Sequence, residues 1–285
     1  MSKILPRLLL CIAGFLMPGL EAADATNSPV PIFADKRLEA AVRQQVFAKR
    51  GSQEPLTAAD VGTVSTVSAP FAGITNLTGL EHCRSLAMLE LPGNRIVDLR
   101  PLSGLKQLQL VNLASNSVKV LTPLSGVPAL QYLELTRNQV SDVSPLAGLT
   151  NLASVYLTGN RLASVSALTN LTRLTTVYLD GNKISNLAGF EALRGITSLS
   201  ASKNRIADLS PVAGFRAPFH LNLSGNRIRD LAPLEKWMAP DLAGPRSFAP
   251  FVRIQLQGNP LSRNSKKVLE VLKSQGARIN PAEAN

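Results

Sequence analysis

Asparagines recur every 22 residues along this chain, and this spacing constrains the fold more than any other feature of the sequence. The stretch LELTRNQVSDVSPL, residues 133–146, is typical, because Asn138 stands among aliphatic residues at the spacings of a buried core. A fixed period of this size indicates a solenoid, in which each repeat forms one coil and stacks on its neighbours. The asparagines in register are Asn94, Asn116, Asn138, Asn160, Asn182, Asn204 and Asn226.

The repeated asparagine is predicted to be a structural residue rather than a ligand contact. A coil that turns sharply leaves backbone N–H and C=O groups facing the interior, and each one without a partner costs about 1–3 kcal/mol. An inward-pointing amide carries donor hydrogens and an acceptor oxygen, so it can join its own turn to the next coil. We therefore expect a ladder of buried asparagines along the solenoid.

The repeat register weakens at both ends of the array. The stretch VSTVSAPFAGITNLTGLEHC keeps the leucine spacing but has Ala72 in place of the asparagine, and Asn259 follows Asn226 by 33 residues. One coil therefore carries an 11-residue insertion, which we place at 238–248. Because this segment is rich in proline, glycine and alanine, we expect a surface loop there. About nine coils would fill residues 61–262.

Segments on either side of the repeats are predicted to form helical caps, which would cover the apolar ends of the stack. The front cap occupies residues 26–60, with a stop at Gly51 and a second helix start in TAAD at 57–60. The rear cap and tail occupy residues 263–285, with a helix end at Gly276. The apolar residues at helical spacing are Leu38, Val42, Val46, Val268, Leu269 and Leu272.

The first 25 residues have the three-part layout of a secretory signal. Lys3 and Arg7 precede an apolar run over residues 8–20, and a small-x-small pattern ends at Ala25. An anchoring helix, the alternative, needs about 18–20 unbroken apolar residues, and this run is shorter and contains a proline and a glycine. We therefore expect an exported protein, periplasmic or extracellular, with no membrane span after signal removal.

A single cysteine, Cys83, remains after the signal. The chain can then form no internal disulfide, although an oxidising compartment usually favours them. Cys83 is predicted to be a small core residue, and the lack of cysteine-rich caps indicates a bacterial exported protein.

The frame L-x-x-L-x-L-x-x-N-x-L, the N-x-I-x-D-L-x-P-L half-repeats and the helical front cap resemble the internalin-type leucine-rich repeat proteins of bacteria. The resemblance covers roughly residues 31–275. It implies an α/β fold, a leucine-rich repeat solenoid with a curved parallel sheet on its concave face. It also implies that the protein binds another protein with that face.

All three tyrosines of the chain fall at strand positions that alternate out of the core onto the concave face. Tyrosine is enriched at interface hot spots, although ordinary strand propensity also favours it. Since neighbouring strands are about 4.8 Å apart, the rings should form a patch with an acidic border. The predicted partner-binding residues are Tyr132, Glu134, Tyr156, Tyr178, Asp180 and His220.

The formal net charge of +11 raises the question of an anionic partner. The concave positions hold acidic residues and only Arg253, so nucleic acid is not expected. Other cations follow the repeated asparagines and form one edge: Arg95, Arg161, Lys183, Arg205 and Arg227. This basic edge is either solvated and partly paired with Asp98, Asp208 and Asp230, or, with the C-terminal cap, an adhesion site for a polyanion or envelope surface.

Enzyme chemistry finds little support in the sequence. His82 and His220 are the only histidines, too few for a histidine metal cluster, and no glycine-rich phosphate loop or nucleophile motif occurs. We expect a monomer without catalytic residues, metal or cofactor. Its predicted function is that of a protein-protein interaction module.

Overall fold

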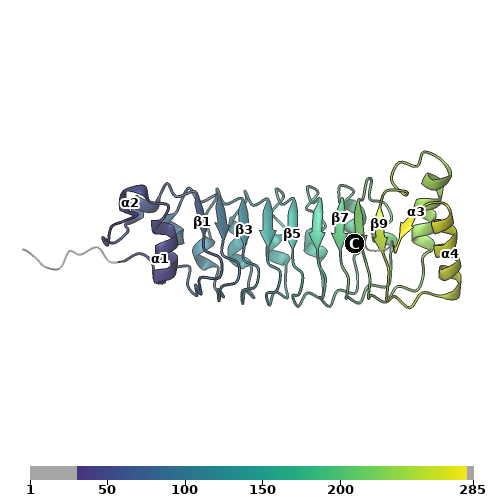
Figure 1. Ribbon diagram of the computed structural model, residues 1–285, viewed down its shortest axis with the longest axis horizontal. Coiled ribbons are helices and arrows are strands. Elements are labelled where there is room, and N and C mark those ends of the chain that lie inside the picture. Colours follow the sequence, from purple (N-terminus) through teal and green to yellow (C-terminus); the bar gives the residue numbers. More distant parts are fainter. Residues whose placement is uncertain (1–30, 281–285) are drawn as a thin grey trace, which may run out of the picture. The chain divides into compact units, whose positions relative to one another are not determined.

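Ten short parallel strands form a single open sheet in a computed structural model that describes residues 31–280. The strands pair in chain order, each with the strand of the next coil (Figure 1). The predicted secretory signal at 1–25 lies outside the described residues. The strands are β1 (Thr66–Ser68), β2 (Met88–Glu90), β3 (Leu110–Asn112), β4 (Tyr132–Glu134), β5 (Ser154–Tyr156), β6 (Thr176–Tyr178), β7 (Ser198–Ser200), β8 (His220–Asn222), β9 (Arg253–Gln255) and β10 (Arg278–Ile279).

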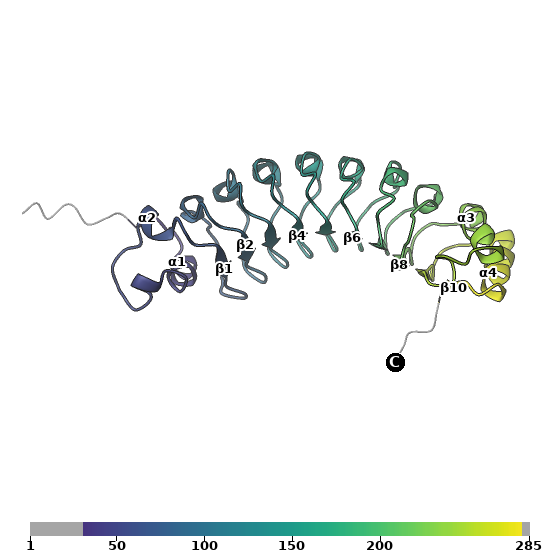
Figure 2. The ribbon, with the colours of Figure 1, turned by 90° about the horizontal axis from the view of Figure 1, so that it is seen from above.

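The return path of most coils contains a short 3₁₀ helix on the side opposite the strands. Figure 2 shows residues 31–280 as an arc, with the strands along its inner side and these turns along its outer side. The predicted leucine-rich repeat solenoid with a concave parallel sheet is therefore confirmed. The 3₁₀ helices of the coils are η2 (Leu80–His82), η3 (Arg100–Leu102), η4 (Thr122–Gly126), η5 (Ser144–Leu146), η6 (Ser166–Leu168), η7 (Phe190–Ala192) and η8 (Ser210–Val212). A further 3₁₀ helix, η1 (Phe47–Lys49), lies in the front cap.

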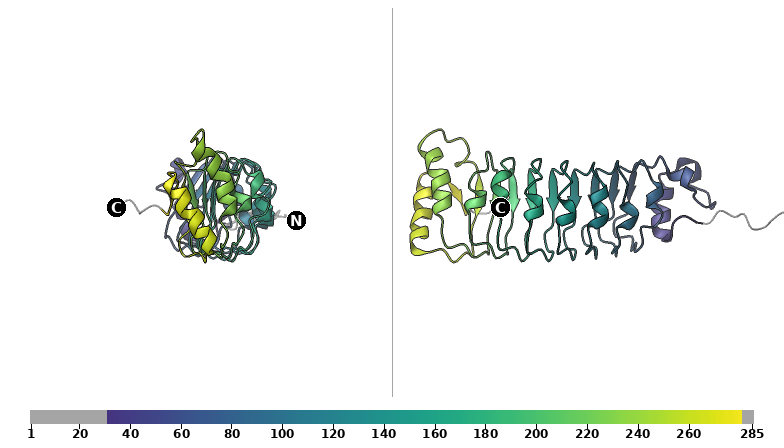
Figure 3. Two further views of the ribbon diagram at one scale, coloured as in Figure 1. Left: turned by 90° about the vertical axis from the view of Figure 1, so that its right-hand side faces the viewer. Right: turned by 180° about the vertical axis from the view of Figure 1, so that it is seen from behind.

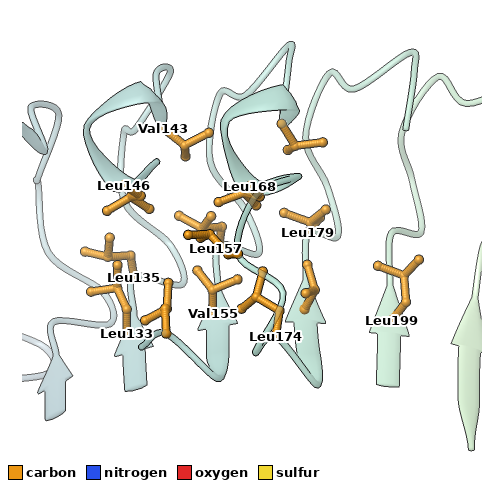
Figure 4. Close-up of a cluster of buried hydrophobic side chains, with 14 of the residues drawn as sticks. Leu133, Leu135, Val143, Leu146, Val155, Leu157, Leu168, Leu174, Leu179 and Leu199 are labelled. Atoms are coloured by element: carbon orange, nitrogen blue, oxygen red, sulfur yellow. The ribbon is translucent and has the colours of Figure 1, made fainter. Parts of the chain in front are cut away.

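Leucine and valine side chains fill the interior between strands and outer turns (Figure 4). In the central coil, Leu133, Leu135 and Leu146 are all fully buried. Burying a side chain of this size stabilises the fold by about 1.5–3 kcal/mol. Cys83 lies in the same core, as predicted, and its burial raises the pKa of the thiol to about 12.

The repeated asparagines form the predicted buried ladder. The Asn138 side-chain oxygen Oδ1 accepts a hydrogen bond from Val118 N in the preceding coil, at 2.9 Å. Its Nδ2 donates to Leu113 O of that coil at 2.9 Å and to Leu135 O of its own coil at 3.0 Å. The amide thus joins two coils as expected, but its partner is the preceding coil and not the next one.

The front cap contains two helices, α1 (Lys36–Arg43) and α2 (Ala58–Val61). The Asp35 carboxylate begins α1 by accepting from Arg37 N at 2.9 Å, and it also accepts from Thr75 N at 2.8 Å. This one side chain therefore joins the cap to the first coil. At α2, Thr57 and Asp60 form a capping box, which confirms the predicted helix start.

The first helix is shorter than its sequence pattern predicts. It ends at Arg43 rather than near Gly51, because Gln45 N bonds Val42 O at 2.8 Å and tightens the last turn. The Arg43 guanidinium then donates to Ser52 O at 3.1 Å, which holds the returning chain against the helix. Val46 is buried as expected, but it lies outside the helix.

The insertion is only in part the surface loop that its composition predicts, because residues 244–247 form an exposed turn whereas the first half is helical. Helix α3 (Ala232–Ala243) runs through its first half and buries Met238 and Leu242. Pro240 lies within the last turn, where it lacks the N–H that would bond the carbonyl four residues earlier. In the second half, the Phe248 ring stacks on Trp237 with the ring centroids 4.7 Å apart. The insertion therefore forms part of the rear cap.

The predicted rear helix is present as α4 (Arg263–Ser274), with Val268, Leu269 and Leu272 buried. It packs beside α3 across the end of the stack (Figure 3). The chain then adds β10 to the sheet, a strand that the sequence pattern does not predict. Every helix within residues 31–280 is too short or too polar to span a bilayer.

Candidate partner-binding face

The three tyrosines lie together on the concave face of the sheet. Tyr156 and Tyr178 face each other in the register of β5 and β6, and Tyr132 on β4 lies diagonally from Tyr156. The ring centroids are 5.2 Å apart for Tyr132 and Tyr156, and 5.1 Å apart for Tyr156 and Tyr178. All three side chains are half-buried. We call these three rings the tyrosine cluster.

Carboxylates border the tyrosine cluster at one end. Glu134 lies directly opposite Tyr156 in the register, and Glu90 lies two strands before Glu134 in the same row. The pKa of the Tyr132 phenol is raised to about 12, first by burial and then by the charges of Glu134 and Glu90 and by Tyr156. Burial and the neighbours Tyr178 and Glu134 also raise the pKa of Tyr156. The phenols of Tyr132 and Tyr156 are therefore neutral at physiological pH, and they lie beside the carboxylates of Glu134 and Glu90.

Glu134 and Asp180, both predicted for the acidic border, differ in how the fold already uses them. Glu134 Oε1 accepts one backbone bond, from Thr136 N at 2.7 Å. Asp180 Oδ1 accepts from Ser200 Oγ at 2.6 Å, and from Ser202 N and Oγ at 2.7 and 2.6 Å. Asp180 therefore joins β6 to the next coil, which leaves it less available than Glu134 for a partner.

His220 lies on β8, two strands beyond Tyr178, and is not part of the tyrosine cluster. Burial lowers the pKa of its imidazole, nearby Asp180 opposes this shift, and Arg253 adds to it. The Arg253 guanidinium lies 5.8 Å from the centre of the Phe219 ring. The C-terminal part of the concave face therefore carries mixed charge around a histidine, whereas the tyrosine cluster is aromatic and acidic.

A shallow groove beside Tyr132 was not recognised in the sequence. Its volume is about 310 Å³. Its apolar wall is Met88, Leu110 and Tyr132, which are in register on β2, β3 and β4. The available signal was two large apolar residues, Met88 and Leu110, at solvent-side strand positions. The lining residues are Ser65, Thr66, Ala87, Met88, Gln109, Leu110, Gln131 and Tyr132.

The basic edge is exposed and is not paired with aspartates in the way the sequence suggests. Within residues 31–280, none of its five cations forms an ion pair, and Asp98 instead pairs with Arg100 at 2.7 Å. Asp208 and Asp230 each accept the backbone N–H two residues ahead, at 2.8 and 2.9 Å. These aspartates therefore start the outer turns, and the pairing prediction is wrong for them.

Metal-ligating side chains do not gather in the described part of the chain, where no group of three or more His, Cys, Asp or Glu residues is placed to hold an ion. What the concave face offers is a binding surface: apolar and aromatic side chains, carboxylates and backbone-fixed polar groups. Its chemistry suits recognition of another molecule.

Comparison with known proteins places the chain in a family. Leucine-rich repeat family models match residues 84–140, 128–170 and 150–195, and no curated protein matches. Internalin C2 from Listeria monocytogenes is 33% identical, with a TM-score of 0.67 over 74% of this chain and 95% of that chain. The internalin InlF from the same species is 22% identical, with a TM-score of 0.62 over 87% and 90%.

A plant protein shares the fold more distantly. The leucine-rich repeat ectodomain of the Arabidopsis thaliana receptor kinase HAESA is 18% identical, with a TM-score of 0.55 over 72% of this chain and 32% of that chain. The similarity to internalin C2 indicates the same family as the repeat frame, the asparagine ladder and the helical caps. The chain belongs to the internalin-type leucine-rich repeat proteins.

Proposed function

We propose that this protein is an exported interaction module that binds a protein partner on its concave face, through the tyrosine cluster. The observation that carries the proposal is the contact of three half-buried tyrosine rings beside Glu134. Rings of this kind combine apolar area with a polar tip, and clustered aromatic residues dominate the binding energy of many interfaces. The HAESA ectodomain, which shares the fold, is bound to a peptide hormone in its structure.

Export is the second part of the proposal, and it rests on the N-terminal sequence. The cationic start, the apolar run and the small-x-small pattern ending at Ala25 support removal of a secretory signal. The single cysteine of the remaining chain, buried in the core, is compatible with an oxidising periplasmic or extracellular space. The proposed mature protein is a monomer.

Site-specific photo-cross-linking tests the concave-face assignment. A photoreactive residue replaces Thr176 on β6, next to the tyrosine cluster, or Ser125 on η4 of the outer side as a control. Bacterial envelope and host-cell extracts supply the partner. We expect a cross-linked protein from Thr176 that is lost when Tyr156→Ala is introduced into the same chain, and none from Ser125.

The opposite pattern would contradict the assignment. Cross-links from Ser125 alone would place the contact on the outer side. A Thr176 product that persists at full yield in the Tyr156→Ala chain would show that the tyrosine cluster does not carry the binding. Both replaced residues lie on the surface of the coil, so the two chains should unfold at similar temperatures, which a thermal scan checks.

A further inference from the structure

The concave face carries two distinct rows of side chains on β2, β3 and β4. The first strand position gives an apolar row, Met88, Leu110 and Tyr132. The third position gives a polar row, Glu90, Asn112 and Glu134, which we call the acidic row because of its two carboxylates. Residues two apart on a strand share a face about 6.6 Å from one another. The apolar row and the acidic row therefore run side by side along the stack.

The apolar row forms the wall of the 310 Å³ groove, whose other lining residues are mainly small or uncharged polar ones. Met88, Leu110 and Tyr132 are each half-buried, so part of every side chain faces solvent. Removing apolar surface from water is worth about 25 cal/mol per Å². Binding therefore gains free energy when an apolar side chain of a partner fills the groove and removes this row from water.

The acidic row carries negative charge without a cation of its own. Within residues 31–280, neither Glu90 nor Glu134 forms an ion pair. The acceptor side of Asn112 is already used by the backbone, since its Oδ1 accepts from Ala114 N at 3.1 Å. The cations of the basic edge follow the repeated asparagines, and the exposed strand cations Arg253 and Arg278 lie on β9 and β10, five or more strands beyond Glu134. A partner's cation would therefore meet two uncompensated carboxylates here, beside aromatic rings that also attract cations.

We propose that the partner segment bound on this face is an extended polypeptide stretch in which apolar and cationic side chains alternate. Successive side chains of an extended chain point to opposite sides, so one set enters the groove and the other set faces Glu90 and Glu134. The two rows span β2 to β4, about 10 Å, and the tyrosine cluster continues the surface to β6, about 19 Å from β2, which an extended chain covers with about six residues. This inference rests on the proposed concave-face function and specifies its chemistry.

Binding of short peptides to the full chain tests the inference, with fluorescence anisotropy as the readout. The probe is a six-residue peptide in which leucine and lysine alternate. One control alternates leucine and glutamate, and a second has three leucines followed by three lysines. We expect the alternating cationic peptide to bind about tenfold more tightly than either control, and its affinity to fall with added salt.

Charge-neutral variants test whether the cationic peptide binds at the acidic row. Glu90→Gln and Glu134→Gln together should weaken the alternating cationic peptide about tenfold. The glutamine at 134 retains a carbonyl oxygen for Thr136 N, so the strand geometry is preserved. The control is Glu235→Gln, an exposed residue of α3, which should leave the affinity unchanged.

Three results would overturn the inference: no binding by the cationic peptide, equal binding of the acidic peptide, or unchanged affinity in the double glutamine variant. The cross-linking at Thr176 separates this failure from failure of the proposed function. If Thr176 still cross-links a partner in a Tyr156-dependent way, the concave face binds a partner of other chemistry. If Thr176 cross-links no partner, the concave-face function itself fails.

Discussion

Asn160→Ala is expected to destabilise the solenoid by about 1–3 kcal/mol. The Asn160 side-chain oxygen is the acceptor for Val140 N at 2.9 Å, and the substitution leaves this buried N–H without a partner. The amide nitrogen also donates to Leu135 O and Leu157 O, at 2.9 and 3.0 Å. Leu135 O retains the Asn138 amide as a donor, so the orphaned N–H dominates the loss. Urea unfolding followed by circular dichroism measures the change.

The matched control for the ladder is Asn170→Ala. Asn170 is an exposed asparagine ten residues further along the chain, in the outer part of the same coil. Surface changes of this kind usually stay within about 0.5 kcal/mol. Equal unfolding midpoints for the Asn160 and Asn170 variants would contradict the structural role of the ladder.

Asp241→Ala is expected to destabilise the rear cap by about 3–5 kcal/mol. The buried Asp241 carboxylate accepts from Ser247 N at 2.8 Å, Phe248 N at 3.1 Å and Ala249 N at 2.9 Å. Its removal leaves three backbone donors without their acceptor where the chain returns from α3 to β9. Amide hydrogen exchange should accelerate most over residues 244–252, and the urea midpoint should fall.

The same carboxylate predicts a pH dependence. Burial acts to raise the pKa of Asp241, but the backbone hydrogen bonds from Ala249, Ser247 and Phe248 outweigh it and lower the pKa. A carboxyl with a lowered folded-state pKa contributes stability above its unfolded pKa and loses it as pH falls. The stability difference between wild type and Asp241→Ala should therefore be full at pH 6 and shrink below about pH 4.

Asp142→Ala provides the comparison for Asp241. Asp142 is exposed and accepts from a single backbone N–H, that of Ser144 at 2.8 Å, together with the hydroxyl of the same residue. Its loss should cost less than about 1 kcal/mol. A cost for Asp241→Ala no greater than this would show that the segment after α3 does not depend on the buried carboxylate.

The coil architecture was predictable because one period repeats the same local chemistry. A buried amide such as Asn138 is explicable from the backbone groups that a turn exposes, and the structure supplies those partners. The first half of the insertion differs from the prediction because Pro240 and the nearby glycine indicate a loop. Leu234, Met238 and Leu242 are four residues apart, which is helical spacing. That signal was present, and the composition of the segment obscured it.

The candidate site was partly predictable for a similar reason. Strand alternation places the tyrosines on one face, but the diagonal contact of Tyr132 with Tyr156 depends on side-chain torsions that the repeat does not fix. The engagement of Asp180 by Ser200 and Ser202 also depends on the residues of the neighbouring coil. The strand β10 has only two residues and lacks the repeat frame, so no sequence pattern predicts it.

The affinity of the partner recovered by cross-linking, measured for Tyr156→Ala and Lys267→Glu, separates the tyrosine cluster from the basic surfaces. Tyr156 contacts both other rings, whereas Lys267 is an exposed cation of α4. We predict that Tyr156→Ala weakens binding by about 1–3 kcal/mol, that Tyr156→Phe retains most of the affinity, and that Lys267→Glu changes it little. Unchanged affinity for Tyr156→Ala together with loss of binding for Lys267→Glu would contradict concave-face recognition and favour the cap and basic edge.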